Sequence, residues 1–450
     1  MKYRLQNLRF SAHWMARLGS ALKVVLGNLA LFLVLMELLA NAAYFAETGR
    51  LYYLHKPVGR QVGVALESSV ESYLIHPYYG YTLRPTASAA PPGSGDTAIR
   101  VNNFGFESAR DYPVVREKPE RFLVGIFGGS VAAKLAAFET QEGILAKKLA
   151  TALKRRPEDI VILNFAQGGF KQPQQLLVLG HLLAIGQELD LVLEIDGFND
   201  VALAGTNLRA GIVEGMPSVD HVRALQDVTS IADSPEAVEK LLDIRRHWVR
   251  YARTFNRAWG DKAWELRFAS GFLADWMAYK FHLRRYHKSR LGYAESEAGD
   301  GSWLYLQQRK HKTVPLTLLP RIVKLWARST QLMDGMQHGI NGRYLHFVQP
   351  NQYYDTGRVY SDAEHQVAFA KHSGYAPFVQ QGYPLLEIEA SRLKAAGFPI
   401  WNLSRIFDEV PEPVYADDCC HYTDLGQKIL AEQIGDIAAR QISDHSAGIR

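Results

Sequence analysis

The sequence predicts an α/β protein with a parallel sheet, preceded by a membrane-spanning helix and interrupted by a helical insertion. Three observations support this prediction. Short β-branched or aromatic runs alternate with amphipathic helical stretches, which is typical of a parallel sheet. A 22-residue apolar run lies near the N-terminus, and about 140 residues separate two consecutive predicted strands.

The predicted sheet has five strands, each ending close to a glycine or a polar residue. They cover residues 121–127, 159–165, 189–196, 343–349 and 398–403. The helices predicted between and after them cover residues 139–154, 173–187, 316–339, 378–396 and 425–439. We therefore expect one α/β domain over residues 121–445, preceded by an irregular, proline-containing linker or cover segment over residues 46–120.

The insertion is expected at about residues 201–342, and its middle part is basic and aromatic. Residues 245–290 contain twelve Lys and Arg against three Asp and Glu. Aromatic and basic side chains recur there at helical spacing, on different faces: Trp248, Tyr251, Phe255 and Trp259, and Arg246, Arg250, Arg253 and Arg257. Two interpretations stay open, a helix lying on an anionic membrane surface and a helix packed on its own domain with a solvated arginine face.

The apolar run at residues 24–45 would extend about 33 Å as a helix, which is enough to cross a bilayer. Basic residues are concentrated in residues 1–23, so the N-terminus is expected in the cytoplasm and the rest of the chain outside it. A cleaved signal peptide is the alternative, because Ala40-Asn41-Ala42 has the pattern of a cleavage site. A buried core helix is a further alternative. Glu37 is costly in lipid and indicates either a helix partner or a carboxyl tolerated near the interface.

Composition excludes several classes of protein. The net charge is only +5 over 450 residues, which does not favour nucleic-acid binding. The two cysteines, Cys419 and Cys420, are adjacent, so they provide neither a disulfide scaffold nor a four-cysteine zinc site.

The candidate nucleophile is Ser130, which follows the first predicted strand in Gly128-Gly129-Ser130. Ligands bind at the carboxyl ends of parallel strands, and the glycines allow a sharp turn that exposes the hydroxyl. The next two strands end in Gly168-Gly169 and in Gly197-Phe198-Asn199-Asp200. A backbone N–H beside a glycine and an asparagine amide are suitable donors for an oxyanion.

The candidate acid-base pair lies near the C-terminus in Asp418-Cys419-Cys420-His421. A three-residue step can place Asp418 and His421 on one side of a turn, where the carboxylate orients the imidazole and stabilises its charged form. A loop after the fourth strand contains Gln349, Pro350 and Asn351. It either lines an acyl or sugar pocket or is a turn fixed by Pro350 and Asn351.

These spaced blocks resemble the SGNH (GDSL-like) hydrolase family, over about residues 122–434 apart from the insertion. The resemblance matches Ser130 to the nucleophile, Gly169 and Asn199 to the oxyanion hole, and Asp418 with His421 to the final block. It implies a flavodoxin-like three-layer α/β/α sandwich. Many members have aspartate at the position of Gly129, and segments 76–80 and 102–106 look like those of the membrane-anchored bacterial type.

The resemblance implies an extracytoplasmic serine esterase that acts on O-acetylated glycans or related small acyl esters, without a metal or other cofactor. An acyltransferase that passes an acetyl group to a glycan would use the same residues. The alternative without catalysis is a membrane-attached assembly protein on this fold, since a fold does not guarantee activity.

Overall fold

The computed structural model describes residues 2–49, 51–54, 73–86, 100–222, 235–259, 268–297, 305–307, 309, 315–370 and 373–447. The chain divides into two compact units. Residues 1–71 and 230–302 form what we call the anchor unit, and residues 72–229 and 303–450 form the sandwich unit. Each unit is described by itself.

The sandwich unit contains a five-stranded parallel sheet, which confirms the predicted fold class. The strand order is β6 (Ile160–Asn164), β5 (Phe122–Gly128), β7 (Leu191–Asp196), β8 (Arg343–Val348) and β9 (Ile400–Asn402). The first of these strands in sequence therefore lies between the second and the third, and ligands of such sheets bind at the carboxyl ends of the strands where the order reverses. Ser130 lies two residues after the end of β5.

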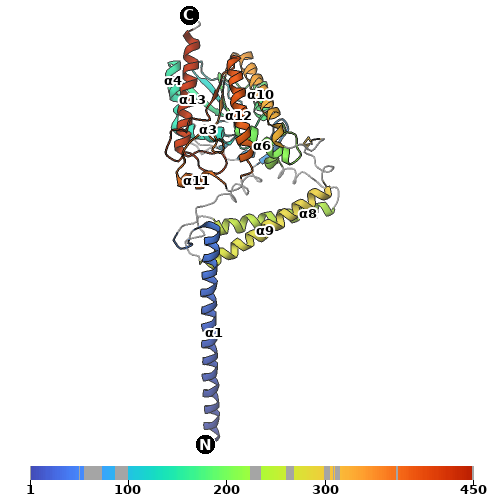
Figure 1. Ribbon diagram of the computed structural model, residues 1–450, viewed down its shortest axis with the longest axis vertical. Coiled ribbons are helices and arrows are strands. Elements are labelled where there is room, and N and C mark those ends of the chain that lie inside the picture. The colour runs from blue at the N-terminus through green and yellow to red at the C-terminus, as the bar shows by residue number, and fades with distance from the viewer. Residues whose placement is uncertain are drawn as a thin grey trace. The chain divides into compact units, whose positions relative to one another are not determined.

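Helices cover both faces of the sheet (Figure 1). One group packs together from the start and the end of the unit: α3 (Ser130–Glu142), α4 (Ile144–Leu153) and α13 (Asp424–Ala447). The other group comprises α5 (Gln174–Ala184), α6 (Phe198–Arg209), α10 (Leu319–Gly339) and α12 (Ala376–Ala395). The strands between them are almost wholly buried, as expected for apolar runs in a sheet covered on both faces.

The helix predicted for residues 139–154 is two helices in the structure. Gly143 has φ of 61° and ends α3 in the left-handed conformation, after which α4 begins at Ile144. The buried carboxylate of Glu139 accepts a hydrogen bond from the backbone N–H of Leu145 at 2.8 Å, at the N-terminus of α4. Burial raises the pKa of Glu139 to about 7 despite these backbone donors.

Replacing Glu139 by glutamine should change how stability depends on pH. The folded-state pKa of about 7 lies above the unfolded value of 4.5, so the native state binds more protons and stability is lost as pH rises between them. We expect the wild type to lose about 2 to 3 kcal/mol of unfolding free energy from this group between pH 5 and pH 8. Urea unfolding of Glu139→Gln at both pH values should lack this loss, whereas the exposed-site control Glu142→Gln should retain it. Equal pH dependence in all three proteins would contradict the assignment.

The segment before β5 is more ordered than the sequence indicates. It contains two antiparallel pairs, β1 (Tyr73–His76) with β2 (Gly80–Leu83) and β3 (Arg100–Val101) with β4 (Glu107–Ser108). Its buried aromatic residues Tyr79, Tyr81 and Phe106 join a cluster with Phe165 and Phe170 of the sandwich unit. The part of the predicted cover segment from residue 72 onward therefore belongs to the sandwich unit and packs beside the loop that follows β6.

The anchor unit consists of α1 (Lys2–Thr48) with a helical hairpin, α8 (Pro235–Trp259) and α9 (Ala269–Glu297). Residues 22–47 of α1 have a mean hydropathy of 2.1, and among the described helices this is the one long and apolar enough to cross a membrane. Its aliphatic side chains are exposed. Such a helix is consistent with a signal anchor or a signal peptide.

The aromatic face of α8 is buried inside the anchor unit. Trp248 and Tyr251 pack with residues of α9, and Phe255 and Trp259 join a cluster that includes Tyr44 of α1. The structure thus favours an aromatic face packed against protein over one lying on lipid. The elements that cover this face are α9 and α1, and not the α/β domain. The predicted insertion at about residues 201–342 includes α6 and α10, and both helices belong to the sandwich unit. Only residues 230–302 of it belong to the anchor unit.

Candidate active site

Ser130 is the first residue of α3, and its position depends on the two glycines before it. A Cβ at Gly128 would come within 2.1 Å of the Ile195 carbonyl oxygen, and one at Gly129 within 2.2 Å of Nδ2 of Asn199. The absence of side chains therefore lets β5 approach β7 and lets the Asn199 amide lie against the residue before Ser130. Any side chain at Gly129 would therefore displace the Asn199 amide.

The structure brings Ser130 and His421 into direct contact. His421 Nε2 lies 2.7 Å from Ser130 Oγ, across 291 residues of sequence. His421 Nδ1 forms a short hydrogen bond with Asp417 Oδ2. Because a carboxylate only accepts hydrogen bonds, Nδ1 carries the proton, and Nε2 is free to accept the proton of the serine hydroxyl. This is the geometry of a serine nucleophile with its general base and an orienting carboxylate.

The structure corrects the prediction for Asp418, because the carboxylate on His421 belongs to its neighbour Asp417. Oδ1 of Asp417 accepts hydrogen bonds from the backbone N–H groups of Cys419, Cys420 and His421, at 3.0, 3.1 and 3.2 Å. These bonds curl the loop around the Asp417 carboxylate, so that the imidazole four residues later lies over its second oxygen. Asp418 is exposed, and its carbonyl accepts a hydrogen bond from Tyr353.

The electrostatic environment keeps the Asp417 carboxylate ionised. Partial burial acts to raise its pKa, but hydrogen bonds and charge interaction with His421 and backbone donors together hold the pKa below its usual range. Burial raises the pKa of the neighbouring Cys420 thiol well above its usual value, and its Sγ lies 3.1 Å from that of Cys419. The Cys420 thiol is therefore neutral, and the negative charge in contact with His421 is that of Asp417.

The start of α6, which carries Asn199, and the loop that carries Gly169 meet beside Gly129. Asn199, the second residue of α6, donates from Nδ2 to the Phe170 carbonyl at 2.8 Å, and that carbonyl also borders Gly129. Gly169 precedes Phe170 and has φ of +78°. A Cβ at Gly169 would come within 2.5 Å of the His221 ring, so this histidine covers the glycine.

His221 is a neighbour of the site that sequence reasoning missed. Its ring stacks on Tyr81 with a centroid separation of 5.4 Å, and its Nδ1 lies 3.1 Å from Ser218 Oγ. Burial lowers the pKa of His221, which favours a neutral ring against the Gly169 loop. His221 lies within the insertion predicted from the sequence, and no recognisable motif surrounds it. The sequence therefore offered no reason to place it beside the Gly169 loop.

A buried layer of polar groups lies beneath the site and holds the ends of the strands. Asp200 accepts hydrogen bonds from the backbone N–H of Gln172 at 2.8 Å and of Gly197 at 3.2 Å. It thereby ties the loop after β6 to the turn that presents Asn199. Lys171, also buried, donates to the carbonyls of Glu214 and Met216, and burial lowers its pKa to about 8.

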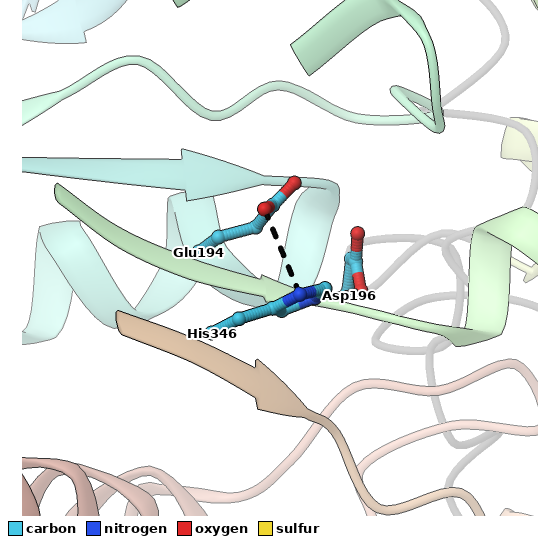
Figure 2. Close-up of side chains that lie close together, drawn as sticks. All are labelled: Glu194, Asp196 and His346. Carbon is cyan, nitrogen blue, oxygen red and sulfur yellow. Dashed lines mark hydrogen bonds and ion pairs between the residues drawn. The ribbon is translucent and has the colours of Figure 1, made fainter. Parts of the chain in front are cut away.

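Glu194, Asp196 and His346 form a buried cluster in this layer, on β7 and β8 (Figure 2). Their candidate ligand atoms lie within 4.8 Å of one another, which is compatible with a metal ion. Hydrogen bonds from other protein groups nevertheless engage these ligand atoms. Asp196 Oδ1 accepts from Trp326 at 2.8 Å and lies 2.7 Å from His346 Nε2, and Glu194 accepts from Tyr344 and Gln172. Burial, with Asp196 and Asp200 nearby, raises the pKa of Glu194, so a proton on Glu194 reduces the buried negative charge.

The two residues predicted to bind substrate follow the end of β8. Gln349 and Asn351 are both buried. Asn351 donates to the Cys419 carbonyl at 3.1 Å and accepts from the Tyr353 N–H at 3.0 Å, so it fixes its own turn and the catalytic loop. Because both the NH₂ group and the oxygen of the Asn351 amide form hydrogen bonds within the protein, the structure supports the alternative that Asn351 stabilises a turn.

A cavity of about 490 Å³ lies next to this turn. Aromatic and polar side chains line it, including Tyr353, Tyr354, Tyr360, Phe369, Asp355 and Arg358. Gln352, also in its wall, donates to the Asp417 carbonyl at 3.0 Å, and Tyr353 donates to the Asp418 carbonyl at 2.8 Å. The cavity wall and the loop carrying His421 are therefore linked directly, although neither Ser130 nor His421 lines the cavity.

Comparison with known proteins adds no family assignment, because the sequence matches no protein-family model and no curated protein.

Proposed function

We propose that this protein is a serine ester hydrolase with Ser130 as nucleophile, His421 as general base and Asp417 as orienting carboxylate. The observation that carries the proposal is the continuous contact from the Ser130 hydroxyl through the His421 imidazole to the Asp417 carboxylate. An ordinary polar surface rarely aligns these three groups at the carboxyl edge of a parallel sheet, where ligands bind.

In the proposed reaction, Ser130 Oγ attacks the ester carbonyl carbon while His421 Nε2 takes the hydroxyl proton. The tetrahedral oxyanion accepts hydrogen bonds from the Asn199 amide and from backbone N–H groups at Ser130 and the Gly169 loop. His421 then returns the proton to the leaving alcohol, which leaves an acyl-serine. Water, activated by the same histidine, attacks this acyl group and releases the carboxylic acid and free Ser130.

We further propose that the substrate is a small acyl ester on a glycan, such as an O-acetyl group. The aromatic and polar wall of the 490 Å³ cavity supports this choice, because sugars stack on aromatic rings and hydrogen-bond with neighbouring polar groups. Acyl transfer to a second sugar hydroxyl would use the same residues and differ only in the final acceptor. Mass spectrometry of the products distinguishes a free acid from a transferred acetyl group.

The test is covalent labelling of the full-length protein, in detergent, with a fluorophosphonate, followed by peptide mass spectrometry. We expect one modified serine, Ser130, together with release of acetate from p-nitrophenyl acetate or an acetylated glycan. Ser130→Ala should remain unlabelled. Absence of both labelling and ester hydrolysis in a correctly folded protein would refute the proposal.

We also propose that α1 is a retained single-pass anchor in a bacterial inner membrane, with the sandwich unit on the periplasmic side. The basic N-terminal flank supports this orientation. Retention is supported by packing, since Ala40, in the possible cleavage pattern, is fully buried against the hairpin. Cleavage at this point would remove Glu37, whose carboxylate accepts hydrogen bonds from the first two residues of α9, and Ala40.

Expression with tags at both ends should therefore yield one membrane-bound species that carries both tags. Intact mass spectrometry should give the mass of the whole chain. A soluble mature protein that begins near Ala43 would show instead that the segment is a signal peptide.

A further inference from the structure

Glu37 lies inside the apolar stretch of α1, yet its carboxylate has partners from another helix. It accepts hydrogen bonds from the backbone N–H groups of Ala269 at 2.6 Å and Ser270 at 3.0 Å, the first two residues of α9, and from the Tyr53 hydroxyl. A carboxylate at a helix N-terminus satisfies N–H groups that have no partner within the helix. The start of α9 is therefore fixed at the depth of Glu37 along α1.

The next turns of α9 follow the last turns of the apolar stretch. Ten residues after Glu37, Glu47 pairs with Lys280 at a distance of 3.4 Å, eleven residues after Ala269. These ten residues of α1 cover about 15 Å. If residues 22–47 cross the bilayer, the first three turns of α9 lie at the depth of the outer half of that bilayer.

The outward side of these turns is apolar. Phe268, Met277 and Phe281 are exposed by 72, 58 and 56%, whereas Asp275 pairs with Arg257 of α8. The turn after α1 adds Leu54, which is 70% exposed. These side chains continue the exposed aliphatic surface of α1, and on a water-facing hairpin they would be costly.

Basic residues become frequent where the apolar stretch of α1 ends. Tyr251 of α8 lies beside Tyr279 of α9, with centroids 5.6 Å apart, so this part of α8 is level with Lys280 and Glu47. Exposed Arg246, Arg250 and Arg253 flank it on α8. Arg284, Arg285 and Lys288 follow on the exposed side of α9. An apolar section followed by a basic one matches the change from acyl chains to anionic headgroups.

We propose that the α8–α9 hairpin is a second membrane-binding element, which inserts the first three turns of α9 into the outer leaflet and binds anionic phospholipid headgroups through the arginines of α8. This inference rests on the proposal that α1 spans the membrane. In Figure 1 the hairpin leaves α1 obliquely near its C-terminal end, as this arrangement requires. The hairpin thus fixes α1 in depth as well as in orientation.

The test measures the depth of single positions in full-length protein reconstituted into liposomes. Met277→Cys, Leu33→Cys and Ile388→Cys, exposed by 58, 59 and 66%, each receive a bimane label. Bimane can also label the native Cys419 and Cys420, so the fluorescence of labelled wild-type protein is subtracted. Lipids brominated near the headgroup should quench position 277 most, lipids brominated near the chain end should quench position 33 most, and neither should quench position 388.

The outcomes separate this inference from the anchor on which it rests. Quenching at position 33 without quenching at position 277 would refute hairpin insertion and leave the anchor intact. Loss of quenching at both positions would refute the anchor as well. If position 277 is quenched no more than the control position 388, we conclude that the hairpin does not insert.

The headgroup contact is tested with spin-labelled phosphatidylglycerol and phosphatidylcholine. Replacing Arg246, Arg250 and Arg253 together by glutamine should bring the preference for phosphatidylglycerol toward equal association of the two lipids. The matched control replaces Lys134, Lys428 and Arg440, three exposed basic residues of the sandwich unit, and should retain the preference. An unchanged preference in the arginine variant, or an equal loss in both variants, would overturn the headgroup assignment.

Discussion

Asp417→Asn is expected to lower kcat for ester hydrolysis by roughly 10⁴-fold, the effect of removing the charge but not the shape of an orienting carboxylate. An amide at this position also presents an N–H to the imidazole and favours the wrong tautomer, in which Nδ1 accepts and Nε2 holds the proton. Asp418→Asn is the matched control, since it makes the same chemical change one residue away at an exposed position.

The measurement is kcat on one soluble acetyl ester for both variants, each first shown to be folded. The Asp418→Asn enzyme should stay within about threefold of the wild type, as surface substitutions away from a site usually have small effects. The reverse ranking, with Asp418→Asn the more impaired, would show that the loop rearranges in the working enzyme and that the orienting carboxylate is Asp418.

The second large effect is expected at the nucleophile and its base. Ser130→Ala and His421→Ala should each lower kcat by roughly 10⁶-fold, and the double variant should be no worse than either single one, because both residues act in the same step. Residual hydrolysis should remain from oxyanion donors and substrate binding.

The kinetics of the two single variants and the double variant form a double-mutant cycle on the same ester. The fluorophosphonate should fail to label Ser130→Ala and should label His421→Ala far more slowly than the wild type. Multiplicative losses in the double variant would mean that Ser130 and His421 act independently, and near-normal rates in both single variants would remove the basis for a serine hydrolase.

Local sequence patterns were sufficient to predict the sheet. The first and last residues of all five strands differ from the predicted ones by at most two positions. Short β-branched and aromatic runs that end in glycine or a polar residue are typical of buried strands. The same strand ends placed Ser130 and Asn199 at the starts of the helices that follow two neighbouring strands, β5 and β7. The contact between Ser130 and His421 depends on the packing of α13, which begins just after His421, against α3, which begins with Ser130.

Asp417 and Asp418 could not be separated by sequence, because a three-residue and a four-residue step to histidine are both possible in a turn. The choice depends on the backbone N–H groups of residues 419 to 421, which converge on one carboxylate oxygen. Similarly, the aromatic spacing in α8 predicted a buried face but not its cover. The cover includes Tyr44 and Phe272, and no local pattern links residues so distant in sequence.

The hydrogen bond between Glu37 and Ala269 spans 232 residues of sequence, so Ala269 is synthesised well after Glu37. At about 5 to 20 residues per second, a ribosome needs roughly 10 to 50 s to synthesise that interval. During this time α1 has left the ribosome, but neither helix of its hairpin exists, so Glu37 has no capping partner from α9. If α1 crosses the membrane as proposed, it would enter the bilayer before Glu37 gains these two backbone donors, and the cost of placing a carboxyl group in lipid would have to be met in another way at that stage.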